Sequence, residues 1–140
     1  MFDQPIKSIM EQKRFLTAPP ETTVSNAARL MADRNVGAVL VVANEHLLGI
    51  FTERDAVFRV IAKGRDANTT PLTEVMTAAP KTLEPSKTYG HALLLMQENG
   101  FRHVPVVENG RPVGVISSRN AMDPDLEEYV FEARRREHLR

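Results

Sequence analysis

Two short stretches of the chain carry the same pattern of polar residues: GIFTERD, which ends at Asp55, and GVISSRN, which ends at Asn120. Each places a hydroxyl three positions before its last residue, Thr52 in the first and Ser117 in the second. An ionised Asp55 accepts strong hydrogen bonds from hydroxyl groups, whereas Asn120 accepts them only as a neutral amide. The two stretches therefore predict two related polar sites of unequal strength.

The same residues also have ordinary structural uses. The first stretch stands where a strand is expected to end and a helix to begin, near Arg54, so that backbone N–H groups there point toward a bound anion. Because Asp is favoured at helix starts, Asp55 is equally suited to capping that helix. Thr52 and Ser117 fit a strand as well as they fit a site. Both interpretations stay open at this point.

Other chemistry has little support in the sequence. The 140 residues include no cysteine, which excludes disulfides, thiolate metal sites and cysteine nucleophiles. His46 and His138 have no metal-ligand partner at a useful spacing. The chain also lacks a Gly-x-Ser-x-Gly, Walker or His-Glu-x-x-His motif. We therefore predict neither a metal site nor an enzyme.

The charge and the apolar pattern argue against two further classes of partner. Eighteen Lys and Arg residues balance eighteen Asp and Glu residues, so no global field attracts nucleic acid or an anionic membrane. The start of the chain lacks the basic region and apolar run of a signal peptide. No apolar run approaches the roughly 20 residues that a membrane span needs. We expect a cytoplasmic protein that does not contact a membrane. The neutral net charge disfavours nucleic acid as a partner but does not exclude a local basic patch.

The repeated stretch belongs to a longer internal duplication. Gly114 opens the second copy as Gly49 opens the first, and the same offset aligns 17–57 with 82–122 without a gap. Apolar positions fall on apolar positions along this match, as Val41 does on Val106. Each half shows the pattern of a helix followed by two apolar strands.

The duplication predicts two small half-domains that depend on each other. We expect helices at 23–35, 54–64 and 88–100, a short helix at 72–76, and strands at 38–42, 47–52, 103–107 and 113–117. A half of about 60 residues buries too little apolar surface to be stable alone. The predicted fold is therefore α/β (α+β), with two pseudo-symmetric repeats packed face to face through their sheets, each a small three-stranded sheet with two helices. The predicted divisions are 1–66 for the first repeat, 67–123 for the second and 124–140 for a C-terminal helical extension.

With this duplication and order of motifs, the chain resembles the CBS domain pair, also called a Bateman module. The resemblance covers 5–122 and rests on GIFTERD, on the VMT opening, and on the strand stretches VGAVLVV and FRHVPVV. It implies a regulatory fold that binds adenosine-containing ligands (AMP, ADP, ATP, S-adenosylmethionine or NAD) in clefts between the repeats. It also implies disc-like homodimers, and no required cofactor besides the regulatory ligand.

The resemblance further implies which residues hold the ligand. Asp55 would accept hydrogen bonds from both ribose hydroxyls, and Thr52 would offer its hydroxyl to phosphate. Basic residues of the opposite repeat would meet the phosphates, and the base would lie against the segment that opens the second repeat. The candidate ligand-binding residues are Thr52, Asp55, Arg102, His103, Met76, Thr77 and Pro80.

A second, weaker site is expected in the other cleft. There the positions of Arg102 and His103 are taken by Gly37 and Ala38, which carry no charge. The candidate residues of this weaker site are Ser117, Asn120, Lys7, Ile9 and Met10.

The sequence leaves two functions and three uses of the tail open. The leading hypothesis is a sensor that binds AMP, ADP or ATP and signals by a conformational change to a protein partner. The alternative is a ligand-independent homodimeric interaction scaffold.

The tail DPDLEEYVFEARRREHLR predicts a helix with an apolar face, Leu126, Tyr129, Val130 and Ala133. That helix would dock on its own domain, pack across a dimer, or contact nucleic acid through ARRRE.

Overall fold

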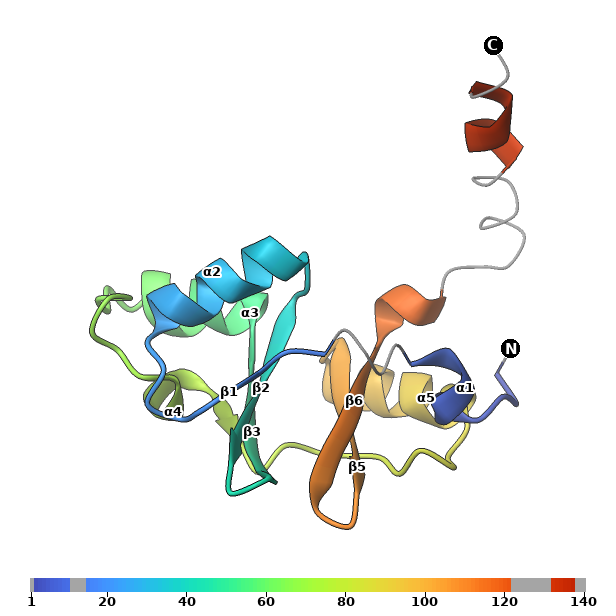
Figure 1. Cartoon of the computed structure of the whole chain (residues 1–140), viewed down its shortest axis with the longest axis horizontal. Coiled ribbons are helices and arrows are strands. Elements are labelled where there is room, and N and C mark those ends of the chain that lie inside the picture. Colours follow the sequence, from blue (N-terminus) through green and yellow to red (C-terminus); the bar gives the residue numbers. More distant parts are fainter. Residues whose placement is uncertain (1, 11–14, 122–131, 138–140) are drawn as a thin grey trace.

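The computed structural model describes residues 2–10, 15–121 and 132–137, with 120 and 121 as backbone only. Two lobes lie side by side, each built on a small sheet (Figure 1). The first lobe contains β1 (Thr17–Ala18), α2 (Val24–Arg34), β2 (Ala38–Ala43), β3 (His46–Thr52), α3 (Glu53–Asp55), the π-helix η1 (Ala56–Ile61), α4 (Leu72–Val75) and β4 (Thr77–Ala78). The second contains α1 (Ile6–Ile9), α5 (Tyr89–Asn99), β5 (His103–Glu108), β6 (Arg111–Ser117) and the 3-10 helix η2 (Ser118–Ala121).

The two long helices, α2 and α5, begin and end on matching signals. Thr23 and Thr88 each accept a hydrogen bond from the backbone N–H three residues on, at 3.3 and 3.2 Å. The helices end at Asn35 and Gly100, whose φ angles of 53° and 73° are left-handed. Asn and Gly adopt this conformation at the lowest steric cost. The sequence pattern thus predicted both helices, and Thr23 caps the first.

The strand pairing repeats with the offset seen in the sequence. β1 is parallel to β2, and Ala18 lies opposite Val41. In the second lobe Leu83 forms a parallel bridge to Val106, which is the same pair shifted by that offset. The hairpins β2–β3 and β5–β6 are antiparallel, and each shifts register directly after Val41 or Val106. The predicted α+β fold of two repeats is therefore confirmed.

The strands divide differently from the expected three in each half. The first sheet has the order β1-β2-β3-β4, whereas the second sheet consists of β5 and β6. The fourth strand of the first sheet is Thr77–Ala78, which pairs with Gly49 and Ile50 of β3. A segment that opens the second repeat thus completes the sheet of the first.

The core packing shows that the two repeats exchange their opening segments. Leu72 and Val75 of α4 are buried in the first core, together with Phe51. Ile6 of α1 and Met10 are buried in the second core, which also contains Tyr89 and Ile116. Each lobe therefore closes its core with a short helix from the other half of the duplication. The divisions at 66 and 123 remain a prediction.

The two sheets meet in a third apolar cluster. Ala38, Leu40 and Ile50 of the first sheet are buried there, and Val115 of β6 packs against them. This cluster excludes water from the sheet faces between the lobes, which fixes the lobes against each other.

Part of the predicted C-terminal extension is described. Residues 132–137 are helical, whereas Leu126, Tyr129 and Val130 of the expected apolar face lie outside the described residues. Within the described ranges, no helix has the length and apolar character to cross a membrane.

Candidate functional site

The first lobe places a polar corner where β3 passes into α3. Thr52, the last residue of β3, lies opposite Ala38, the first residue of β2. The N–H of Glu53 donates to the carbonyl of Gly37 at 3.0 Å. The strand ends are thereby joined just where the backbone turns into the helix.

The second lobe repeats this corner with different side chains. His103 lies opposite Ser117, and the N–H of Ser118 donates to the carbonyl of Arg102 at 3.0 Å. The hydroxyl of buried Tyr89 donates to the carbonyl of Ser117 at 3.0 Å, which anchors the strand end to α5. Burial raises the pKa of Tyr89 to about 12, so this hydroxyl keeps its proton. The hydrogen bond from Tyr89 thus fixes the end of β6 against the start of α5.

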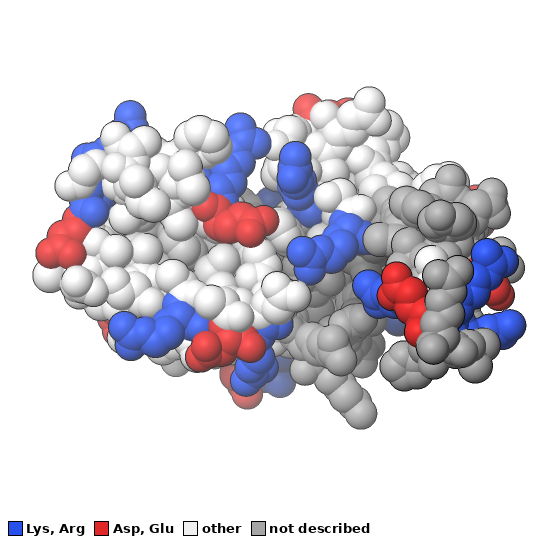
Figure 2. Space-filling view, turned by 90° about the horizontal axis from the view of Figure 1, so that it is seen from above, with Lys and Arg blue, Asp and Glu red and all other residues white. Residues whose placement is uncertain are grey.

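A cleft of about 590 Å³ opens between the two corners. Its ionisable lining side chains are Arg34, Arg102, Arg119, His103 and Glu53. Figure 2, which looks onto the molecule from above, shows basic side chains on both sides of the seam between the lobes. Because the basic groups outnumber the single acid, the cleft favours an anion.

Gly37 brings an acid of one lobe close to a histidine of the other. A Cβ at this position would lie 2.9 Å from Oε1 of Glu53 and 3.2 Å from Nε2 of His103. The missing side chain therefore leaves room for both groups. Burial lowers the pKa of His103, the charge of Glu53 acts against this, and Arg119 and Arg102 lower it further.

This pKa predicts a loss of stability in mild acid. Above its ordinary pKa of 6.5, His103 is neutral in both the folded and the unfolded chain. Its contribution to the free energy of unfolding is therefore fully present at such pH values. As pH falls through 6.5, the unfolded chain takes up a proton that the folded chain resists, and the free energy of unfolding falls. Urea unfolding between pH 7.5 and 5.5 should show a smaller decline for His103→Gln than for the wild type. His91→Gln, at an exposed helix position, should keep the full decline, and equal slopes in all three would contradict this origin.

Thr52 and Asp55 stand beside the cleft and bond to each other. Oδ2 of Asp55 accepts hydrogen bonds from the N–H of Thr52 at 3.0 Å and from its hydroxyl at 3.2 Å. The N–H of Asp55 in turn donates to the hydroxyl of Thr52 at 3.3 Å. This is a capping box in which Thr52 is the N-cap residue, and Asp55 fills the third helical position. The ligand roles predicted for both residues remain predictions.

The capping box is expected to contribute measurably to the stability of the fold. Thr52→Val keeps the shape of the side chain but removes the hydroxyl, and should lower the free energy of unfolding by about 1 kcal/mol. Urea denaturation followed by circular dichroism measures this change. Thr82→Val, at an exposed loop position, serves as the control. Equal unfolding midpoints for Thr52→Val and the wild type would show that the box contributes nothing.

The residues expected around the base lie along the other side of β3. Thr77 pairs with Ile50, and a Cβ at Gly49 would lie 2.5 Å from Sδ of Met76. Pro80 follows β4 and is half-buried. These three candidates therefore lie in or next to β4, which pairs with β3, the strand that ends at Thr52.

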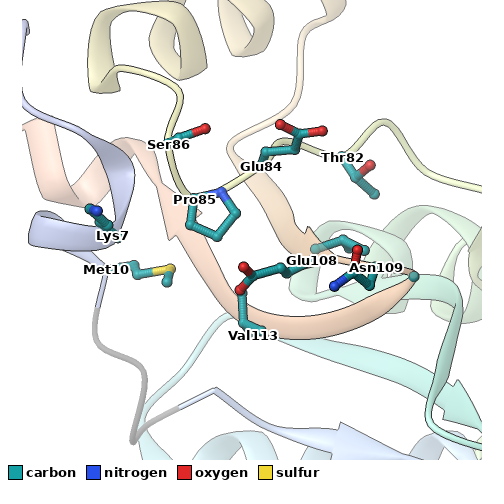
Figure 3. Close-up of a pocket in the computed structure, with 11 residues that line it drawn as sticks. Lys7, Met10, Thr82, Glu84, Pro85, Ser86, Glu108, Asn109 and Val113 are labelled. Atoms are coloured by element: carbon teal, nitrogen blue, oxygen red, sulfur yellow. The ribbon is translucent and has the colours of Figure 1, made fainter.

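The candidates for the weaker site are divided between two places. Ser117 lines the cleft between the lobes, with Arg102 and His103. Lys7 and Met10 line a different hollow of about 1030 Å³ on the second lobe, shown in Figure 3 with Glu84, Asn109 and other residues around it. Ile9 packs against the second core, and Asn120 lies in η2 with its side chain outside the described residues.

Sequence reasoning did not assign three charged residues of the cleft. Arg119 stands in the repeated stretch at the position of Arg54, which was a visible signal. Arg34 ends α2, where a basic residue is common for reasons of the helix dipole alone. Glu53 gave no signal of its own. Among the described residues, no group of three or more His, Asp or Glu side chains is placed to hold a metal ion.

Fold and site together define a class of protein: a pair of intertwined α+β repeats with a polar cleft between them. The family model of the CBS domain matches residues 6–62 and 72–124, so the chain belongs to the CBS domain family.

Individual relatives agree with this assignment. The CBS domain-containing protein YhcV of Bacillus subtilis is 37% identical over 101 residues, which cover 72% of this chain and 71% of that protein. The CBS domain-containing protein CBSCBSPB1 of Arabidopsis thaliana is 39% identical over 102 residues, or 72% of this chain. The match spans only 19% of that plant protein. An uncharacterised conserved protein from Pyrococcus horikoshii superposes with a TM-score of 0.81 at 29% identity, covering 87% of this chain and 92% of its own.

Proposed function

We propose that this chain is a regulatory module that binds an adenosine-containing ligand with at least one phosphate in the cleft between its repeats. The observation that carries the proposal is the set of basic residues, Arg34, Arg102 and Arg119, gathered around one opening. Arginine guanidinium groups recognise phosphate through paired, charge-assisted hydrogen bonds. Ligand binding would be reported to a protein partner by a change in the shape of the module, and no catalytic step is assigned to it.

A structural neighbour supports an adenosine ligand for a fold of this kind. The CBS domain pair of protein MJ0100 was solved in complex with 5'-methylthioadenosine and S-adenosylmethionine, at a TM-score of 0.76 and 24% identity. At that identity the likeness concerns the fold alone. In the present chain the arginines favour AMP, ADP or ATP over S-adenosylmethionine, because a sulfonium cation would be repelled by them.

The pose we propose places each part of the nucleotide against a different element. The phosphates would lie in the cleft near Arg102 and Arg119. The ribose would contact Asp55 at the start of α3, and the base would lie along Met76 and Thr77. Asn120, as a neutral amide, would leave the corresponding site of the second repeat weaker.

Isothermal titration tests the proposal directly. AMP, ADP, ATP, S-adenosylmethionine and NAD are titrated into the wild type, Asp55→Ala and Asn120→Ala. We expect saturable binding of at least one phosphorylated compound that is lost in Asp55→Ala and retained in Asn120→Ala. No binding of any compound at millimolar concentration would refute the sensor function. Because Asp55 also belongs to the capping box, circular dichroism must first show that its variant is folded.

A second proposed property is assembly into a homodimer through η1. Val57, Phe58 and Ile61 expose 49%, 56% and 72% of their surface on this one helix. The guanidinium of Arg54 lies over the ring of Phe58, 5.2 Å from its centre, and so borders the patch. Exposed apolar patches with a polar border are typical of protein interfaces. If no ligand binds, this patch favours the alternative function of a homodimeric scaffold.

Light scattering after gel filtration tests the dimer. The wild type should have twice the mass of the monomer, whereas Ile61→Glu should be monomeric because it places a charge inside an apolar contact. Leu48→Glu, at an exposed leucine of β3, should remain dimeric. A monomeric wild type, or a dimeric Ile61→Glu, would rule out this interface.

A further inference from the structure

Arg59 of η1 joins the proposed ribose anchor to the segment that opens the second repeat. Its Nε lies 3.4 Å from Oδ1 of Asp55, one helical turn earlier. Its Nη1 donates to the carbonyl of Met76 at 2.9 Å and to the carbonyl of Val75 at 3.4 Å. One side chain therefore contacts both the residue expected to hold the ribose and the residue expected to border the base.

The capping box leaves Arg59 the remaining oxygen of Asp55. Oδ2 already accepts two hydrogen bonds from Thr52. Oδ1 faces Nε of Arg59, and the Asp55 side chain is only 11% exposed. A carboxylate oxygen accepts about two hydrogen bonds, so a ribose that donates both hydroxyls to Asp55 needs both acceptor sites of Oδ1, one of which faces Arg59. Oδ2 is committed to holding the helix start.

The second repeat lacks both members of this pair. At the offset that places Gly49 on Gly114, Asp55 corresponds to Asn120, and two residues beyond the gapless match Arg59 corresponds to Pro124. Proline has no side-chain donor, and a neutral amide does not attract a guanidinium as a carboxylate does. The arginine thus occurs in the repeat that has the carboxylate and is missing from the repeat that does not.

We propose that Arg59 is an internal competitor of the ligand: its guanidinium occupies Oδ1 of Asp55, and the ribose displaces it. This inference rests on the proposed function and describes the regulation of the same site. Displacement is feasible because the Arg59 side chain is 49% exposed, so its guanidinium can turn into solvent.

Displacement would also carry a signal. While Arg59 contacts Asp55, its Nη1 holds the carbonyls at the end of α4, a segment of the second repeat buried in the first core. When the guanidinium leaves, that contact between η1 and α4 is lost. The free and bound states then differ in how firmly the exchanged segment is attached. A ligand that binds one of two such states better shifts the population toward it.

The test uses adenosine, which has ribose and base but no phosphate, so the arginines of the cleft add little. Adenosine is titrated into the wild type, Arg59→Met, Arg59→Lys and Arg65→Met. Arg65 is the matched control because it forms an ion pair with Glu74 of α4 without being bonded to Asp55 in the structure. We expect Arg59→Met to bind adenosine about fivefold more tightly, or ~1 kcal/mol, by relief from competition. Arg59→Lys and Arg65→Met should stay within about twofold of the wild type.

The outcomes separate this inference from the proposed function. Equal or weaker binding by Arg59→Met, with clear binding by the wild type, would overturn the competitor and leave the sensor in place. Tighter binding by Arg65→Met as well would overturn it too, since loosening α4 alone would then suffice. No adenosine binding by any of the four proteins, together with none of AMP or ATP, would overturn both. Hydrogen exchange adds a second readout: saturating adenosine should speed exchange at the Met76 amide, which donates to the carbonyl of Leu72 at 2.8 Å.

Discussion

Replacing Arg102 and Arg119 together by alanine is expected to weaken ATP binding about 30-fold. Both side chains line the cleft between the lobes and come from the same corner of the second repeat. A charge-assisted hydrogen bond to phosphate is worth about 1.5–3 kcal/mol when shielded, and less at an exposed position. Taking about 1 kcal/mol for each exposed arginine gives ~2 kcal/mol, which corresponds to this 30-fold loss.

The loss of affinity should be confined to ligands that carry phosphate. Adenosine carries no phosphate, so its affinity should change by less than about threefold in the same double variant. Arg111→Ala is a control for the loss of one arginine away from the cleft, because Arg111 lies at the β5–β6 turn and pairs with Glu45 at 3.0 Å. The wild-type affinity for ATP should also fall with rising salt, and the variant should show a flatter dependence. An equal loss for ATP and adenosine would mean that the arginines support the fold of the site and do not bind phosphate.

Gly49→Ala should lower the free energy of unfolding by about 2 kcal/mol, as overpacked cores do. A Cβ at this position would lie 2.5 Å from Sδ of Met76 and 2.8 Å from the carbonyl oxygen of Thr77. The methionine side chain can turn aside, but the carbonyl belongs to β4 and moves only with its strand. The added methyl group therefore forces β4 away from β3, and the first sheet loses its fourth strand.

Gly114→Ala provides a close control for this change. Gly114 is the counterpart of Gly49 in the second half of the duplication, and a Cβ there would lie 2.7 Å from Sδ of Met10. Its nearest neighbours belong to the flexible methionine side chain and not to backbone. Urea unfolding should thus show a clearly smaller loss for Gly114→Ala. Equal losses for the two variants would locate the strain in the methionines and refute the role of β4.

The sequence was sufficient for the two long helices, the two hairpins and the duplication, but it did not predict β4 or the π-helical form of η1. Valine-rich runs such as 38–42 read as buried strands because β-branched side chains suit a pleated, buried surface. The constant offset between the halves, which was read from the sequence, reappears in the structure in the pairing of Leu83 with Val106. What a local pattern cannot show is which core a short apolar helix enters. Ile6 has the same apolar character whether it packs on its own repeat or on the other.

The candidate site was only partly predictable for a related reason. Arg102 and His103 were found because the family resemblance implies basic residues of the opposite repeat at the phosphates, and these two stand in the matching stretch. Arg34 lies outside that stretch and reaches the cleft only because α2 ends there. The pairing of Asp55 with Arg59 follows ordinary helical spacing. The additional contact of Arg59 with the carbonyl of Met76 depends on how α4 packs, and local spacing in the sequence does not specify that packing.

The exchanged helices also impose an order on synthesis. The N–H of Ile6 donates to the carbonyl of Lys87 at 2.7 Å, although more than half of the chain lies between these two residues. Because α1 is synthesised long before α5, it must wait for α5, and contacts of such long range form slowly. The first core is likewise open until Leu72 and Val75 have emerged. A nascent chain arrested between its repeats would have neither core closed, and neighbouring chains on one messenger RNA would be able to trade α1 before either is complete.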